Sequence, residues 1–301
     1  MAHWKDSLAI KAVNVLAFVI FLSSNAYTSL APEKGNWGAG PHETYITPER
    51  WIFAVWPVIH TLLLGMVVIQ FFEVGYDPVV KVVGWRFPIL AVLTSIYSAL
   101  NTASTEHGEH HDRRVFSILA FVALLLSAGV ISHIYRDLKV RHAPSSWIDA
   151  LFVHVPFSLY HGFVVVLLVV SGFAAFGVNA NKHSAGVITK ILVFMALLFL
   201  EATAAGYVVV MQCPTTNTLR RAHACPLAHS QFYGKGDIGG ALVICLSLLA
   251  IFQHQTASSF IHWSALAFFI ISLVAVLRAT IAAFRGGRIA LSDEERAPLV
   301  V

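Results

Sequence analysis

The sequence predicts an all-α fold, a polytopic bundle of transmembrane helices, from the length of its apolar stretches and from its composition. Stretches of about the length that crosses a bilayer, roughly 20 residues, follow one another along the 301-residue chain. The composition is 57% hydrophobic and 12% charged, whereas soluble domains carry about 25% charged residues. Because lipid offers no hydrogen-bond partners to the backbone, each stretch is expected to be helical.

We expect about eight spans. The predicted spans are residues 9–30, 51–72, 87–104, 115–135, 148–177, 187–211, 238–253 and 260–284. The seventh is the shortest and has Gly239-Gly240 at its start, so a re-entrant segment, and therefore seven spans, is the alternative. The first also has the features of a cleaved signal peptide, and this stays open. Together they predict one transmembrane domain over 1–286 and a short polar tail over 287–301.

Basic residues predict the orientation. Lysines and arginines are more frequent in the loops on the side of the N-terminus, so we expect that side to be cytoplasmic. The net charge of +4 is explained by residues that face lipid headgroups, and membrane lipids rather than nucleic acid are the expected partners. The oligomeric state stays open, with a homodimer as one alternative.

Two segments within the spans combine aromatic, polar and proline residues. In the second span, Thr47 is expected to cap the helix, and Pro57 is expected to kink it and free carbonyls. In the fifth span, His154 and His161 are seven residues apart and should share one face. Such a face could line a polar cavity or hydrogen-bond to neighbouring helices.

These segments resemble the tryptophan-rich sensory protein family, also called translocator protein or peripheral benzodiazepine receptor. The similar stretches are Thr44–Gly65 (TYITPERWIFAVWPVIHTLLLG), Ala99-Leu100-Asn101 and Val155–Gly162 (VPFSLYHG), and the last spans lie beyond the family's five-helix core. Where the family usually has tryptophans after the Leu-Asn element, Thr102-Ala103-Ser104 stand here, and His161 replaces a more usual apolar residue.

The resemblance implies an intramembrane pocket for a flat, largely apolar ligand such as a porphyrin or a sterol. By position in the matched motifs, its candidate residues are Trp51, Trp56, Asn101, Phe157 and Tyr160. The imidazoles of His60, His154 and His161 could approach a metalloporphyrin, since histidine is a common iron ligand. Haem is therefore a candidate ligand, and no resident cofactor is expected.

A buried acid and two metal-ligand patterns offer other chemistry. Glu201 lies mid-span, where an acid costs about 2.5–3.5 kcal/mol, so it should face the bundle interior, with Arg278 or a histidine as a candidate partner. It either forms a proton or solute path with His154 or His161, or makes a structural hydrogen bond. The histidine-rich loop 106–114 is a metal site or a solvated loop. Cys213 and Cys225 are expected to be free thiols rather than a disulfide or a metal site.

The sequence favours a membrane protein that binds, and could transport, a lipid-like or tetrapyrrole ligand. The alternative is a proton-coupled secondary transporter that uses Glu201 and the intramembrane histidines. We expect no enzymatic activity, because the sequence contains no G-x-S-x-G, Walker or H-E-x-x-H motif.

Overall fold

The computed structural model describes residues 7–30, 43–106, 110–142, 144–208 and 237–285. Within these ranges every regular element is a helix, as predicted. The α-helices are α1 (Leu8–Leu30), α2 (Val55–Ile69), α3 (Glu73–Gly75), α4 (Arg86–Glu106), α5 (His110–Arg141), α6 (Trp147–Asp149), α7 (Val155–Phe176), α8 (Val187–Val208), α9 (Ile238–His254) and α10 (Ser259–Arg285). A 3-10 helix, Arg50–Ala54, precedes α2, and π-helical segments, Tyr76–Val83 and Ala150–His154, precede α4 and α7.

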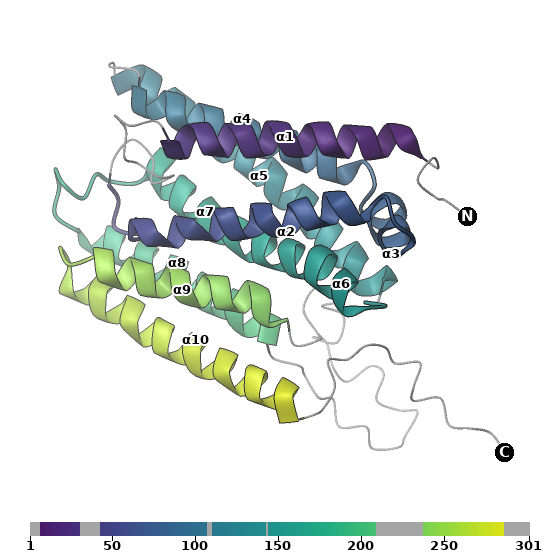
Figure 1. The fold of residues 1–301 in the computed structure, drawn as a ribbon. Helices are drawn as coiled ribbons and strands as arrows, with labels where there is room; N and C mark the ends of the chain where they lie inside the picture. The colour runs from purple at the N-terminus through teal and green to yellow at the C-terminus, as the bar shows by residue number, and fades with distance from the viewer. Residues whose placement is uncertain (1–6, 31–42, 107–109, 143, 209–236, 286–301) are drawn as a thin grey trace, which may run out of the picture.

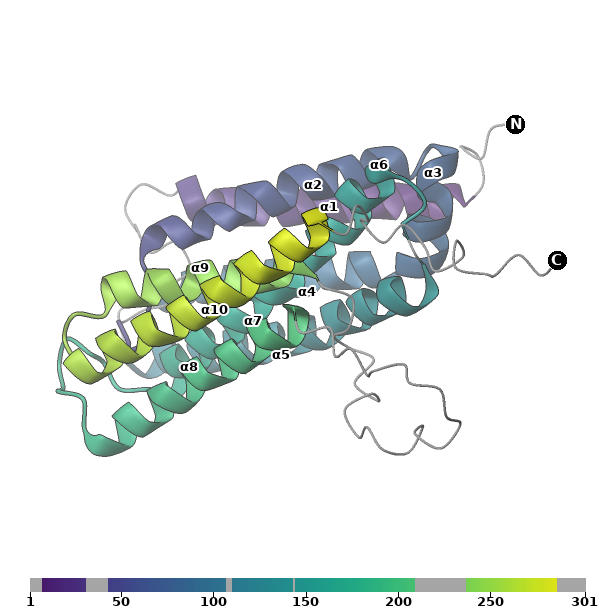
Figure 2. The same cartoon turned by 90° about the horizontal axis from the view of Figure 1, so that it is seen from below.

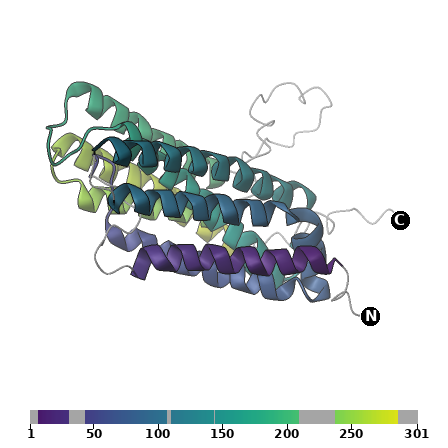
Figure 3. The ribbon, with the colours of Figure 1, turned by 90° about the horizontal axis from the view of Figure 1, so that it is seen from above.

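The long helices lie side by side, and consecutive spans run in opposite directions (Figure 1). We call the end of the bundle where α1 begins and α5 finishes the Lys139 end, and the opposite end, where α2 begins, the Arg50 end. Views from two other sides show that the helices share one long axis (Figures 2 and 3). The outer helices, such as α1, α5, α8 and α10, expose apolar side chains along their length, as a bilayer requires.

The interior consists of two apolar cores that share helix α7. The first is built from α1, α2, α4, α5 and one side of α7, which we call the five-helix part. The second is built mainly from α8, α9, α10 and another side of α7, with Val166 and Val170 facing it. We call α8–α10 the three-helix part. Because α7 serves both cores, most of its residues are buried.

The seventh predicted span is a continuous helix, α9, of 17 residues. Among the described residues, seven helical segments are long and apolar enough to cross a membrane, α2 and α7 being counted with the short helices before them, and α9 is a shorter apolar helix. It packs against α7, α8 and α10, so neighbouring helices shield much of its length from lipid. Its contact with α7 is close, since a Cβ added to Gly162 would lie 2.7 Å from the Gly240 carbonyl oxygen. Small residues allow this approach of two backbones.

The start of the second span differs from the prediction. The N-cap of the 3-10 helix is Glu49 rather than Thr47. Thr47 instead closes a turn, in which its hydroxyl accepts a hydrogen bond from the Thr44 N–H at 2.9 Å. Pro57 lies in the first turn of α2, where the helix changes from 3-10 to α. In the first turn of a helix the N–H groups have no partner within the helix, so the N–H that proline lacks is not missed there. Pro57 therefore does not need to kink a longer helix, contrary to the expectation from the sequence.

Exposed tryptophans mark both ends of the bundle. Trp51 and Trp263 are exposed near the Arg50 end, and Trp85 and Trp147 are exposed near the Lys139 end. Tryptophan is enriched at the two membrane–water interfaces. These side chains therefore form two belts, which fits the chain as an integral multi-pass membrane protein.

Candidate functional site

Aromatic side chains from three helices meet in the five-helix part, and we call this cluster the aromatic site. It consists of Phe21 of α1, Trp56 and His60 of α2, and Tyr160 and Phe163 of α7. The Phe21 ring lies 4.5 Å from the His60 ring and is stacked on Tyr160 at 5.7 Å, measured between centroids. Trp56 contacts Tyr160 and Phe163 edge to face at 5.4 and 5.3 Å. These edge-to-face and stacked geometries are the favourable ones for aromatic pairs.

The aromatic site contains two polar groups whose hydrogen bonds differ. The Tyr160 hydroxyl lies 2.6 Å from that of Thr94 on α4, whose own proton is donated to the Leu90 carbonyl, so Tyr160 donates. His60 Nδ1 donates to the Trp56 carbonyl at 2.7 Å. This fixes the neutral tautomer and leaves Nε2 with a free lone pair. Nε2 is buried and has no hydrogen-bond partner among the described residues.

The other residues of the predicted pocket lie elsewhere. Trp51 is 41% exposed, and its indole N–H donates to the Gln253 side chain at 2.7 Å. Phe157 is fully buried and contacts Phe87 edge to face at 6.5 Å. Asn101 is also buried on α4, about two turns beyond Thr94. Of the predicted residues, the structure brings together Trp56, His60 and Tyr160.

His161 joins three helices. Its Nε2 donates to the Ser132 hydroxyl of α5 at 2.9 Å, because the Ser132 proton is used by the Ala128 carbonyl. Its Nδ1 is bonded to the Tyr207 hydroxyl of α8, and its ring stacks on Tyr135 at 4.9 Å. The imidazole thus has partners on both nitrogens. Of the two predicted roles, lining a polar cavity and bonding to neighbouring helices, this geometry corresponds to the second.

Asp237, at the N-terminus of α9, is the centre of a second network that the sequence did not indicate. Its Oδ2 accepts from the Tyr135 hydroxyl at 2.8 Å and pairs with Lys139 at 2.9 Å. Its Oδ1 accepts from the Ser158 hydroxyl at 2.5 Å and from the Gly239 N–H at 3.1 Å. Burial alone would raise the pKa of Asp237, but the Lys139 charge and the hydrogen bonds outweigh it, so the pKa is lowered.

Glu201 is buried in α8 and lies beside Ser272 of α10 and Cys245 of α9. Its Oε2 has no hydrogen-bond partner among the described residues, and none of the ion pairs found there involves it. Arg278, His154 and His161 are not among its neighbours in the interactions found. The structure therefore places Glu201 in the three-helix part, where no interaction found joins it to either histidine.

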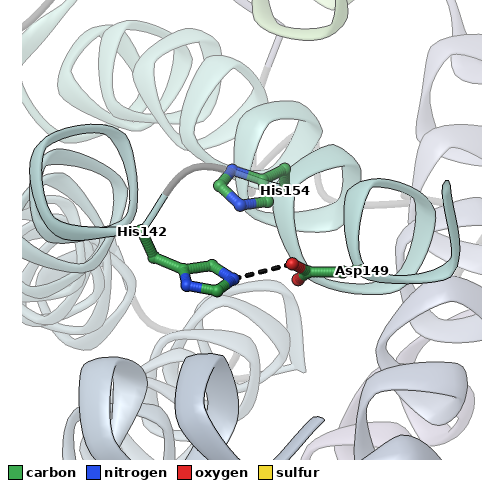
Figure 4. Close-up of side chains that lie close together, drawn as sticks. All are labelled: His142, Asp149 and His154. Carbon is green, nitrogen blue, oxygen red and sulfur yellow. Dashed lines mark hydrogen bonds and ion pairs between the residues drawn. The ribbon is translucent and has the colours of Figure 1, made fainter. Parts of the chain in front are cut away.

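His154 lies near the Lys139 end with His142 and Asp149 (Figure 4). These three side chains are the metal-binding candidates among the described residues, and no spacing in the sequence indicates them. Residues 107–109 of the predicted metal loop lie outside the described residues. Cys213 and Cys225 also lie outside the described residues, while Cys245 is a buried free thiol.

Phe21 and Phe163 of the aromatic site were not predicted from the sequence, nor was Thr94, which bonds to Tyr160 of this site. Each belongs to an apolar helix with no distinctive local pattern, so no signal in the sequence separates it from its neighbours. Asp237 was detectable, since an acid directly before an apolar run is typical of an N-cap. Its partners Tyr135, Lys139 and Ser158 belong to other spans and required the fold.

The apolar bundle defines an integral, multi-pass helical membrane protein. The family model described as TSPO-like protein matches residues 11–278, so the chain belongs to this family. This confirms the resemblance drawn from the motifs. Searches of curated proteins and of solved structures found no match.

Proposed function

We propose that the protein binds a flat, largely apolar ligand of the tetrapyrrole or sterol class at the aromatic site, and that it acts by binding rather than by catalysis. Membership of the TSPO-like family and the convergence of Trp56, His60 and Tyr160 support this function. Aromatic rings stack on planar ligands, and a few polar groups in an apolar site orient them.

The observation that carries the proposal is the free Nε2 lone pair of His60 among aromatic rings. A buried acceptor without a partner costs about 1–3 kcal/mol, which a ligand can recover. A hydroxyl, a carboxylic acid proton or a metal centre carried by the ligand could satisfy it. Sterols and tetrapyrroles carry such groups on an otherwise apolar ring system.

Ligand binding requires the rings of the aromatic site to separate. Phe21 and Tyr160 are fully buried, whereas Trp56 is half-buried. A ligand must therefore replace ring–ring contacts by ring–ligand contacts, and the free energy of opening lowers its apparent affinity. Trp56 is the ring that can move with the least loss of packing.

The test compares Trp56→Ala with Trp51→Ala in nanodiscs, using protoporphyrin IX and cholesterol as separate probes. Trp51 is the matched control, because it lies five residues away on the exposed side. We expect at least one probe to bind the unaltered protein and to bind Trp56→Ala at least about tenfold more weakly, since a lost aromatic contact is worth about 1.4 kcal/mol or more. Trp51→Ala should bind normally. No binding of either probe, or equal losses in both variants, contradicts the proposal.

Transport of the ligand and proton-coupled transport are further proposals. The second would need a continuous polar path, and the separation of Glu201 from His154 and His161 does not favour one. Proton-linked uptake into proteoliposomes that is abolished by Glu201→Gln and unaffected by Trp56→Ala would establish the carrier instead of the binding protein.

We also infer that the Lys139 end faces the cytoplasm. Lys81, Arg86, Lys139 and Arg141 lie there, as the positive-inside rule requires. A membrane-impermeant maleimide applied to whole cells tests this with Lys81→Cys and Lys182→Cys in a background without the native cysteines. We expect labelling of Lys182→Cys alone, and labelling of Lys81→Cys alone reverses the assignment.

A further inference from the structure

We propose that His142, Asp149 and His154 form a binding site for zinc or a similar divalent transition metal, which ties the end of α5 to the start of α7. One ligand atom of each residue lies within 4.8 Å of the others. Tetrahedral zinc with bonds of about 2.0–2.2 Å places ligand atoms roughly 3.4 Å apart. Small side-chain rotations therefore close the set around an ion, and Figure 4 shows the three side chains gathered from two segments.

Unpartnered atoms in this cluster favour a ligand. Asp149 is fully buried, and its Oδ1 has no hydrogen-bond partner among the described residues. His154 is 9% exposed, and its Nε2 also lacks a partner there. A bound cation would satisfy both atoms at once. Two imidazoles and one carboxylate form a ligand set that zinc proteins use, and they leave a fourth position for water.

The surroundings already hold the carboxylate in place. Its Oδ2 accepts from the Ser145 N–H at 3.0 Å and from the Ser145 hydroxyl at 3.3 Å, and the Asp149 N–H donates to the Ser146 hydroxyl. Such hydrogen bonds orient metal ligands. His142 Nε2 donates to the same Oδ2 at 2.7 Å. Metal coordination by that nitrogen would release its proton to solvent, so binding should weaken at low pH.

The π-helical segment explains why residues 149 and 154 share a side. In a regular α-helix, residues five apart point about 140° away from each other. Here the Val155 N–H donates to the Ala150 carbonyl, an i to i+5 bond that widens the turn. The wider turn brings His154 back over Asp149. Segments of this kind occur frequently at functional sites.

Solvent can reach the cluster from the Lys139 end. The His142 side chain is 17% exposed and lies just past the last residue of α5. Lys139, whose charge acts on His154, is paired with Asp237, so its charge is largely balanced. An ion can therefore enter through His142 without crossing the apolar interior.

The experiment is a Co²⁺ titration of detergent-purified protein without a histidine tag, followed by visible absorption and by the zinc-dependent shift in Tm. We expect one ion per chain, ligand-field bands, and a rise in Tm with zinc. His142→Ala, the least disruptive change because it lies outside a helix, should weaken binding more than about 100-fold, since even outer-shell changes cost about 10–100-fold. Asp149→Asn and His154→Gln should do the same.

Two controls make the assignment specific. His133→Ala removes an exposed histidine of α5 and should leave binding unchanged. The double variant His110→Ala/His111→Ala tests the histidine-rich loop. Cobalt binding that survives in His142→Ala and His154→Gln, or that is lost only in the loop variant, overturns the proposal. A shift in Tm that is equal in all variants does so as well.

Discussion

The five-helix part and the three-helix part bury polar side chains in different ways. In the five-helix part some of them join one helix to another, as Thr94 joins Tyr160 and Asn14 joins Gln70, while others, such as Ser127, bond to their own helix. In the three-helix part, Ser247 bonds to its own helix, while Glu201 Oε2 and the Ser272 hydroxyl have no partner among the described residues. Hydrogen bonds therefore specify the packing of the first part much more than that of the second.

The two parts are joined at each end of the bundle by polar contacts. At the Lys139 end, Asp237 of α9 holds Tyr135, Lys139 and Ser158. At the Arg50 end, the Gln255 side chain donates to the Thr44 and Thr47 carbonyls at 3.0 and 2.8 Å. We infer that the three-helix part keeps its position through these contacts and through the close approach of α7 and α9.

The largest expected effect comes from Asp237→Ala. The change leaves the Lys139 ammonium without its buried partner, and breaking a buried pair costs about 3–5 kcal/mol. Lys139 is partly exposed, so we expect about 3 kcal/mol of unfolding free energy to be lost, measured by denaturation in detergent.

Asp77→Ala is the matched control, because Asp77 forms an exposed pair with Lys81 at 2.6 Å. Asp77→Ala should lower the free energy of unfolding much less, because an exposed ion pair is screened by solvent and contributes little. Equal losses in the two variants would mean that Asp237 does not hold the two parts together.

A somewhat smaller effect is expected from Gly162→Ala. The new Cβ would lie 2.7 Å from the Gly240 carbonyl oxygen, so α7 and α9 would have to move apart. Overpacking of this kind costs about 1–3 kcal/mol. Gly129→Ala on α5 meets no atom within 4 Å and should be neutral or stabilising by up to about 1 kcal/mol. Thermal unfolding of both variants measures the difference, and a neutral Gly162→Ala would exclude a tight contact.

Acidification should weaken the contact between the two parts less than Asp237→Ala or Gly162→Ala does. A protonated Asp237 keeps its volume and can still form hydrogen bonds. The pKa of Asp237 is lowered in the folded protein, so the folded state binds this proton less readily than the unfolded state. The stabilisation is fully present above about pH 5 and is lost as the pH falls through the unfolded and then the folded pKa. Tm measured from pH 7 to pH 3 should fall less in Asp237→Asn. Identical profiles would remove Asp237 from the explanation.

The sequence predicted the fold well because span length and hydropathy are local properties. Trp56 and His60 were both named as candidates for one pocket, and their rings lie together in the structure. The sequence did not predict Phe21 or Thr94, because contacts between spans depend on how the helices rotate about their axes. Trp51 was placed in the pocket by its motif, whereas it lies on the surface.

The cluster of His142, Asp149 and His154 shows a second limit of prediction from the sequence. Its formation depends on a π-helical segment, and helical periodicity assumes a regular turn. The spacing of seven residues predicted that His154 and His161 share one helix face. In the structure, His161 bonds to Ser132 of α5, whereas His154 stacks on His142, just past the end of α5. A sequence pattern can define a face, and only the packed structure defines what that face touches.

The smallest expected effect comes from Thr94→Val, which tests whether the hydrogen bond between Thr94 and Tyr160 helps to position the rings of the aromatic site. Thr94→Val removes the acceptor of the fully buried Tyr160 hydroxyl, and hydrogen bonds between membrane helices are worth about 0.6 kcal/mol on average and about 1.7 at most. We expect a loss near the upper figure, because Tyr160 then has no acceptor from α4. Thr203→Val, whose hydroxyl bonds only to Phe199 on its own helix, should change the unfolding free energy by much less. A double-mutant cycle with Tyr160→Phe isolates the pair. A coupling energy near zero would mean that ring packing alone orders the aromatic site, and the contrast with the three-helix part would then rest on the bond between Asn14 and Gln70.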